Sequence, residues 1–230
     1  MKKIGILGGM GPLAGVELQR YIIEATPAKK DQDHLEVVCY TASQVPDRSA
    51  SLAADGGKAY LRAVVEAAQL LVKAGVSVMA IPCNTAHSRL PEIQAEVAVP
   101  IVNMVQLAVE RLLRDYHGMS VGLLATDGTI ASRVYEKTIP HSGIRWVLPR
   151  RDEQKAVMET IYSIKAKGID STSLYHLKRI TRNLIEEGVG VLVAGCTELS
   201  LVTNKIQEEG KPVVDPMRVL AEALVEIGRK

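Results

Sequence analysis

The sequence predicts an α/β protein of two similar domains, each a parallel sheet flanked by helices. Short apolar runs alternate with longer amphipathic stretches, as strands and helices do along a parallel sheet. The second half of the chain also repeats the plan of the first half, with a cysteine at the same place in each. The chain has 230 residues, enough for one large or two small domains.

The first half contains a complete set of strands and helices. Apolar runs predict four strands, over residues 2–9, 35–42, 76–82 and 100–104. Amphipathic spacing predicts three helices, over residues 16–26, 58–74 and 106–116. Gly75 directly follows the second helix, which is typical of a glycine just past a helix C-terminus. Strands that alternate with helices in this way indicate a parallel sheet covered on both faces.

The second half matches these elements one by one. Residues 121–137 resemble the opening of the chain, because Gly122 and Gly128 stand where Gly5 and Gly11 stand in the first half. The predicted helices of this half span residues 174–188 and 217–228. We therefore predict an internal repeat, with the boundary between the domains in residues 104–120.

Two cysteines occupy matching positions in this repeat. Cys83 stands eight residues after Gly75, and Cys196 stands eight residues after Gly188. Each cysteine follows an apolar run, where a parallel strand is predicted to end. Ligands of open parallel sheets bind beyond the carboxyl ends of the strands. We therefore expect both thiols to lie at a ligand site.

Small polar residues follow both cysteines and suit an anionic ligand. Asn84 and Thr85 follow the first thiol, and Thr197 follows the second. Backbone N–H groups that open the next segment can also point at an anion. A thiol at a helix N-terminus is expected to favour the thiolate. The pattern predicts a pocket for a carboxylate, with a thiol beside the carbon atom that carries it.

Two opposed thiols suit the inversion of a stereocentre. One group removes a proton from one face of a carbon atom and the other returns a proton to the opposite face. Proton transfer is most efficient when the pKa of the catalyst lies near the working pH, and an ordinary cysteine has a pKa of about 8.5. The site must also stabilise the carbanion by hydrogen bonds in a dry setting.

Composition and charge exclude several other classes of protein. The formal net charge is +2 without a basic block, so nucleic-acid binding has no support. Three cysteines without a C-x-x-C pair make a disulfide framework or a zinc site improbable. No run of about 18 apolar residues predicts a membrane span. Glycines interrupt the first apolar run, so it predicts a strand rather than a signal peptide, and we expect a cytoplasmic protein.

Two further features have alternative interpretations. Glycines 8, 9 and 11 follow the first strand, as in a nucleotide-binding loop, but their spacing is not G-x-G-x-x-G and no acidic residue ends the second strand. We expect these glycines to let the backbone approach the substrate or the facing domain. Cys39 alternates with Leu35 and Val37 along one strand, so we expect it in the core.

Six short motifs together resemble the aspartate/glutamate racemase family, and most of all its cofactor-independent aspartate racemases. The motifs are GGMGP at 8–12, PDR at 46–48, PCNTAH at 82–87, LLATDGTI at 123–130, GCTE at 195–198 and DPM at 215–217. The resemblance covers nearly the whole chain. It implies two pseudo-symmetric α/β domains with the active site in the cleft between them, a homodimer, and a last helix that packs on the first domain. The implied domains are residues 1–103 with 213–230, and residues 104–212.

The resemblance also implies a role for each matching residue. Cys83 and Cys196 resemble the two acid/base thiols of an enzyme that uses no pyridoxal phosphate, metal or nucleotide. The residues that resemble substrate contacts are Met10, Arg48, Asn84, Thr85, Thr126, Thr129, Lys165 and Thr197. Arg48 and Lys165 would receive the substrate carboxylates, and Met10 would line the pocket. His87 and Glu198 could support the thiols, or could serve packing and the start of a helix.

Three functions remain open at this point. The first is racemisation of aspartate, with glutamate or broader specificity as a close variant, because one methylene is worth only about 1–3 kcal/mol in a pocket. The second is another enzyme of the same scaffold, such as a hydantoin racemase or a maleate isomerase. The third is a two-lobed binding protein for a small molecule, in which the cysteine pair would have no chemical role.

Overall fold

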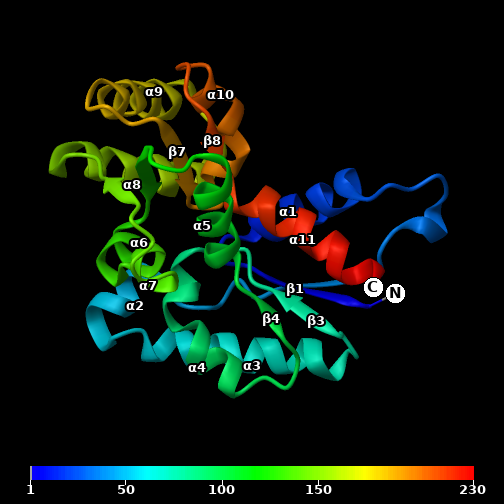
Figure 1. Cartoon of the computed structure of the whole chain (residues 1–230). Coiled ribbons are helices and arrows are strands. Elements are labelled where there is room, and N and C mark those ends of the chain that lie inside the picture. The colour runs from blue at the N-terminus through cyan, green and yellow to red at the C-terminus, as the bar shows by residue number, and fades with distance from the viewer. Residues whose placement is uncertain (1) are drawn as a thin grey trace. The chain divides into compact units, whose positions relative to one another are not determined.

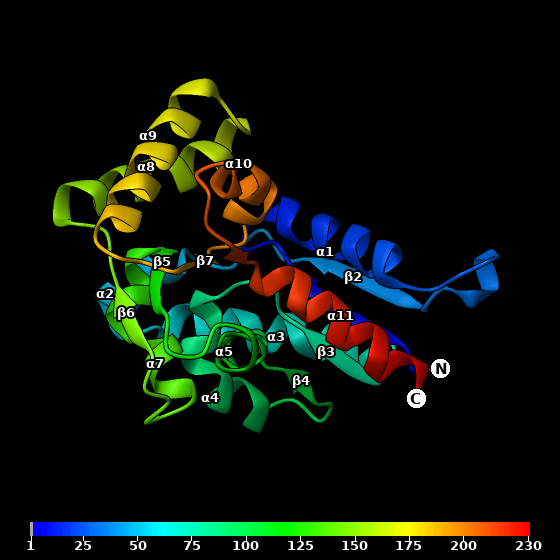
Figure 2. The same ribbon diagram turned by 45° about the horizontal axis from the view of Figure 1, so that its top comes forward.

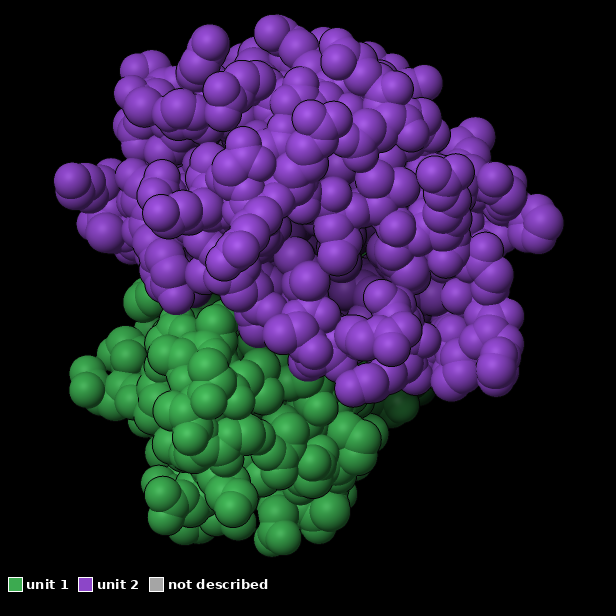
Figure 3. Space-filling model, turned by 90° about the vertical axis from the view of Figure 1, so that its left-hand side faces the viewer, with its two compact units in different colours: residues 1–104, 217–230 green, residues 105–216 purple. Residues whose placement is uncertain are grey.

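The computed structural model describes residues 2–230, and the chain divides into two compact units (Figure 3). Unit 1 comprises Met1–Met104 and Met217–Lys230, and unit 2 comprises Val105–Pro216. The chain crosses from one unit to the other after Met104 and after Pro216. The domain bounds implied by the family resemblance put these crossings after residues 103 and 212. Each unit is described below by itself.

Unit 1 is built around a four-stranded parallel sheet with the order β2-β1-β3-β4. Its strands are β1 (Ile4–Gly8), β2 (Val37–Thr41), β3 (Val78–Ala80) and β4 (Ile101–Val102). Its helices are α1 (Pro12–Ala25), α2 (Arg48–Asp55), α3 (Lys58–Lys73), α4 (Leu90–Ala95) and, for all but its first residue, α11 (Pro216–Arg229), with short 3₁₀ segments η1 (Asp31–Asp33) and η2 (Thr85–Arg89).

Helices cover both faces of this sheet, as the apolar strands require. α3 and α4 lie on one face, and α1 and α11 lie side by side on the other (Figures 1 and 2). α3 buries Tyr60, Val64 and Leu71, which share one face of the helix, in a cluster with Met79 of β3. Because the central strands β1 and β3 are buried on both sides, their sequences are continuous apolar runs rather than alternating ones.

Unit 2 repeats the architecture, with a parallel sheet of order β6-β5-β7-β8. Its strands are β5 (Ser120–Ala125), β6 (Arg145–Val147), β7 (Val191–Gly195) and β8 (Val213–Val214). Its helices are α5 (Met104–Asp115), which begins at the last residue of unit 1, α6 (Asp127–Ser132), α7 (Val134–Thr138), α8 (Arg151–Lys167), α9 (Ser171–Glu186) and α10 (Thr203–Gln207), with the 3₁₀ segment η3 (Leu199–Val202). α8 and α9 pack together over the core (Figure 2).

The two sheets place their strands in the same order, second, first, third and fourth along each half, which confirms the predicted fold. Matching glycines show the same packing contact in both units. A Cβ atom on Gly5 of β1 would lie 3.0 Å from Val76, and one on Gly122 of β5 would lie 3.0 Å from Val189. Each valine comes directly after the glycine that follows a long helix. The repeat therefore extends to individual side chains.

The structure also differs from the sequence expectations in three places. Cys39 is half-buried rather than part of the core, because its strand β2 lies at the edge of the sheet. The helix after β5 is split into α6 and α7 at Arg133, which has a φ of +54°. Tyr60 and Tyr135 are fully buried, whereas an aromatic content of only 3% without Phe predicts an aliphatic core. Within residues 2–230, no helix has both the length and the apolar character needed to cross a membrane.

Candidate active site

The first thiol lies just beyond the carboxyl end of β3. Cys83 follows the last strand residue, Ala80, by three positions and is 5% exposed. Asn84 and Thr85 come next at the start of η2, and both are buried. Thus the structure places the predicted thiol and its two predicted polar neighbours in one tight turn after the strand.

His87 holds this turn in place. Its Nδ1 lies 2.9 Å from the carbonyl oxygen of Cys83, and its Nε2 accepts a hydrogen bond of 3.2 Å from the backbone N–H of Met104. Because Nε2 is an acceptor, Nδ1 carries the proton and donates to the carbonyl. Burial lowers the pKa of His87, so the ring is neutral near pH 7. His87 therefore supports Cys83 through the backbone, at the residue where the chain leaves unit 1.

Arg48 and Met10 come together in unit 1. The Asp47 side chain accepts a hydrogen bond of 2.9 Å from the backbone N–H of Ala50, so α2 begins at Arg48. The Arg48 guanidinium is buried and donates to the carbonyl oxygens of Met10 at 2.8 Å and Pro46 at 3.1 Å. A positive charge therefore lies against the loop that follows β1.

The glycines after β1 serve close packing within unit 1. A Cβ atom on Gly8 would lie 3.2 Å from the Cα atom of Gly15 in α1. One on Gly9, which has a φ of +99°, would lie 2.4 Å from the carbonyl carbon of Ala42. Backbone approaches this close require glycine. The contacts of these two glycines are therefore structural, and they fix the loop that carries Met10.

The second thiol lies at the matching place in unit 2. Ala125 of β5 pairs with Gly195 of β7, and the residues that follow this pair are Thr126 and Cys196. Cys196 is 6% exposed, and Thr197 beside it is 2% exposed. The Thr126 side chain caps α6 by accepting from the backbone N–H of Thr129 at 3.2 Å, and the two hydroxyls are 3.0 Å apart. The structure thus gathers three predicted substrate contacts around adjacent strand ends.

Glu198 is in direct contact with the Cys196 thiol. The Cys196 thiol donates a hydrogen bond of 2.9 Å to Oε2 of Glu198, and both side chains are buried. Burial, followed by the Glu198 charge, raises the pKa of Cys196 well above its usual range, while the positive charge of Lys165 on α8 opposes this shift. The expectation that strand-end geometry favours the thiolate is wrong for Cys196, because burial and a carboxylate outweigh the backbone N–H of Glu198.

Tyr135 is a neighbour of this thiol that the sequence did not indicate. Burial raises the pKa of its hydroxyl well above the usual range, and the charges of Asp215 and Cys196 add to the effect. Asp215, the first residue of the DPM motif, is buried and accepts a hydrogen bond of 2.7 Å from the Ser200 hydroxyl. A tyrosine in a short amphipathic helix carries no pattern that separates this position from ordinary core packing.

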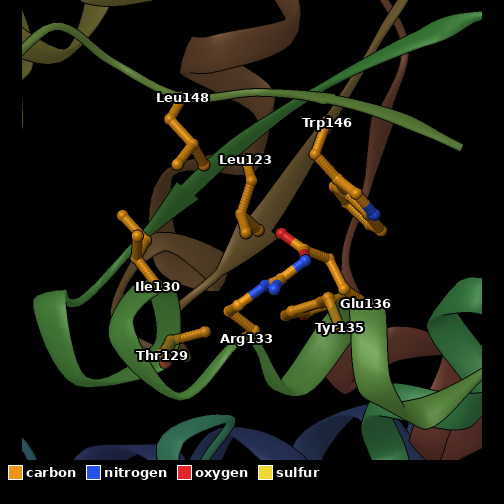
Figure 4. A pocket seen from close by; sticks show the side chains of 8 residues that line it. All are labelled: Leu123, Thr129, Ile130, Arg133, Tyr135, Glu136, Trp146 and Leu148. Atoms are coloured by element: carbon orange, nitrogen blue, oxygen red, sulfur yellow. The ribbon is translucent and has the colours of Figure 1, made fainter.

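A small pocket inside unit 2 has Thr129 and Tyr135 in its walls but not Cys196. Its walls come from Leu123, Thr129, Ile130, Arg133, Tyr135, Glu136, Trp146 and Leu148 (Figure 4). Arg133 and Glu136 form an ion pair there, and the Tyr135 and Trp146 rings meet edge to face with centroids 5.4 Å apart. Within residues 2–230, no group of three or more His, Cys, Asp or Glu side chains is arranged to hold a metal ion.

The predicted site residues therefore form two groups of similar composition. The unit 1 group is Met10, Arg48, Cys83, Asn84 and Thr85, and the unit 2 group is Thr126, Thr129, Lys165, Cys196 and Thr197. Each group combines a buried thiol, side-chain hydrogen-bond donors and one cation. A thiol can give or take a proton, and the donors and the cation can bind a carboxylate.

Comparison with known proteins identifies relatives that cover most of the chain. The chain is 28% identical over 229 residues to the broad specificity amino-acid racemase RacX of Bacillus subtilis (strain 168), covering 96% of each protein. It is also 28% identical over 171 residues to a glutamate racemase of Geobacter metallireducens, covering 72% of this chain and 62% of that protein.

Solved structures share the fold. An aspartate racemase of Picrophilus torridus superposes with a TM-score of 0.85 at 27% identity, covering 100% of this chain and 95% of that chain. An aspartate racemase homologue from Pyrococcus horikoshii OT3 gives a TM-score of 0.76 at 26% identity, with 100% of both chains covered. The family model for Asp/Glu/hydantoin racemases matches residues 7–224, and this chain therefore belongs to that family.

Proposed function

We propose that this protein is an aspartate racemase that interconverts L- and D-aspartate with Cys83 and Cys196 as its acid/base pair. The proposed reaction uses no pyridoxal phosphate, metal or nucleotide. One observation carries the proposal. Each sheet has the same strand order, and in each a buried thiol follows the third strand along the chain. A repeat that keeps its thiol in both copies supports a reaction with two equivalent steps.

The proposed mechanism assigns one proton to each sulfur. One cysteine, as the thiolate, takes the α-proton, and the electron pair of the C–H bond stays on the carbon atom. The other cysteine, as the thiol, gives its proton to the opposite face, and the reaction leaves the thiol and thiolate exchanged. Asn84, Thr85 and Thr197 donate hydrogen bonds that stabilise the charge on the α-carboxylate as the carbanion forms.

Two cations and two hydroxyls complete the proposed substrate contacts. Arg48 and Lys165 receive the two carboxylates of the substrate, one from each unit. The Thr126 and Thr129 hydroxyls act as further donors, and Met10 lines the pocket. A substrate with two carboxylates suits two cations, which supports an acidic amino acid over a neutral one.

The decisive experiment follows the α-hydrogen and the stereocentre together. Purified, reduced protein is incubated with L-aspartate in deuterated water, and chiral chromatography with mass spectrometry follows the D-isomer and its deuterium. Cys83→Ser and Cys196→Ser should each abolish racemisation. Cys39→Ser removes the third cysteine, which is half-buried on β2, and should leave the rate unchanged. Folded wild-type protein that neither racemises nor exchanges the α-hydrogen of any acidic amino acid would refute the proposal.

Broader specificity is the second candidate, and the likeness to the broad specificity racemase of Bacillus subtilis favours it. Under this alternative, the same assay gives comparable kcat/KM values for aspartate, glutamate and neutral amino acids. Under the main proposal, aspartate exceeds the neutral amino acids. A longer or shorter acidic side chain changes kcat/KM by about 10- to 200-fold, the range that one methylene is worth.

The mechanism requires both sulfurs to reach one carbon atom. A short bis-maleimide should therefore link Cys83 to Cys196 within one chain, and peptide mapping would identify the linked pair. Prior incubation with a dicarboxylate should slow the reaction. We further propose a homodimer that works in the cytoplasm, and sedimentation and cell fractionation test these two points.

A further inference from the structure

The residue two positions after each thiol of the repeat differs in charge between the two units. After Cys83 this residue is Thr85, and after Cys196 it is Glu198. The two cysteines are almost equally buried, at 5% and 6% exposed. Two positions after the thiol, the chain therefore carries a hydroxyl group in unit 1 and a carboxylate in unit 2.

The Glu198 carboxylate points at the thiol rather than serving the helix that follows. Glu198 stands at the N-cap position of η3, but within the described residues its side chain makes no capping hydrogen bond there. Its Oε2 instead accepts the hydrogen bond of 2.9 Å from the Cys196 thiol, and the carboxylate is 5% exposed. The alternative that Glu198 only starts a helix therefore has no support.

We propose that Glu198 is a positioning residue that holds the proton on Cys196 in the resting protein. A thiol can donate to a carboxylate, but a thiolate cannot, and at this distance the two negative charges would repel. Deprotonation of Cys196 thus breaks the hydrogen bond and places two anions side by side in a buried site. Membership of the Asp/Glu/hydantoin racemase family does not by itself determine which thiol carries the proton.

Charged groups on other elements face the same thiol and must be weighed. Lys165 on α8 favours the thiolate, whereas the Tyr135 hydroxyl on α7 is neutral near pH 7. Lys165 is half-buried, with its Nζ 5.6 Å from the centroid of the Tyr162 ring, and its positive charge acts on Cys196. Glu198, in direct contact with the sulfur, is the stronger influence.

One consequence of this inference rests on the proposed function: it concerns which enantiomer the resting enzyme can react with first. With the proton on Cys196, the resting enzyme accepts a proton only at Cys83 and so binds productively the enantiomer that presents its α-hydrogen to that sulfur. The opposite enantiomer needs the proton moved to Cys83 first. Since the two enantiomers have equal free energies in water, kcat/KM must be the same in both directions, so this ratio cannot reveal the asymmetry.

Thiol titration tests the proposal without any substrate. Combining Cys39→Ser with Cys83→Ser leaves Cys196 as the single thiol of the chain, and the ultraviolet absorbance of the thiolate reports its ionisation against pH. Adding Glu198→Gln should move the midpoint down by at least one pH unit, which is a tenfold or greater rise in thiolate below the midpoint. Glu159→Gln, on the exposed side of α8, is the matched control and should leave it unchanged.

The wild-type protein supplies a second measurement that needs no folded variant. Limited alkylation with iodoacetamide near neutral pH, followed by peptide mapping, should modify Cys83 before Cys196. Faster alkylation of Cys196, or a Cys196 midpoint that Glu198→Gln does not lower, would overturn the inference while leaving the proposed racemase intact. If the titration gives the expected result but the protein does not racemise acidic amino acids, the proposed function is refuted and the inference about the Cys196 proton stands.

Discussion

Replacing Gly9 with alanine should cost more stability than any other single methyl group added to the loop after β1. Gly9 has a φ of +99°, and a Cβ atom there would lie 2.4–2.6 Å from three backbone atoms of Ala42. Ordinary contacts of a Cβ atom are 3.4–4 Å. The neighbouring atoms belong to the main chain and cannot rotate away, so the β2–α2 loop must shift.

The magnitude follows from two costs. A residue other than glycine at positive φ costs about 1–3 kcal/mol, and forcing an extra methyl group into a packed site costs about 1–3 kcal/mol more. We therefore expect Gly9→Ala to lower the free energy of unfolding by about 2–6 kcal/mol. This is a large part of the roughly 5–15 kcal/mol that stabilises a typical protein.

Gly75→Ala is the matched control. Gly75 also has a positive φ, of +75°, but within residues 2–230 nothing lies within 4 Å of its added Cβ atom. It should cost only the backbone term, about 1–2 kcal/mol. Urea unfolding followed by circular dichroism measures both variants. Equal losses within about 0.5 kcal/mol, the usual error of such comparisons, would refute the argument from the Ala42 contact.

Three further predictions concern the residues that hold the candidate site. Because burial lowers the pKa of His87, this histidine is protonated at a higher pH in the unfolded chain than in the folded one. The free energy of unfolding should therefore fall as the pH drops below about 6.5, by up to about 1.4 kcal/mol per pH unit. In urea titrations His87→Gln should flatten this slope, whereas His117→Gln, at an exposed position, should not. Asp47→Ala removes the cap of α2 and should cost about 1 kcal/mol in thermal unfolding, whereas Asp47→Asn should cost far less. Arg48→Lys should lower kcat/KM for aspartate at least tenfold, because lysine cannot reproduce the planar guanidinium contacts with two carbonyl oxygens; an unchanged value would contradict its role.

The sequence by itself determined the repeat and the strand-end position of both thiols. Strand–helix alternation has a clear period, and a cysteine directly after an apolar run must lie where that strand ends. For the same reason Asn84, Thr85 and Thr197 could be placed from the sequence near the thiols, since each lies within two residues of a cysteine. Such local inferences depend on chain connectivity alone.

The tertiary structure decided which distant groups act on each other. The contact of Arg48 with the Met10 carbonyl joins residues 38 positions apart, and no local pattern encodes it. The exposure of Cys39 depends on which strand lies at the sheet edge, which apolar runs do not reveal. The protonation of Cys196 depends on a balance of burial, Glu198 and Lys165, and the last of these comes from another helix. Electrostatic effects follow distance in space, so only the folded chain could show that Glu198 contacts the Cys196 sulfur and that Lys165 acts on the same thiol.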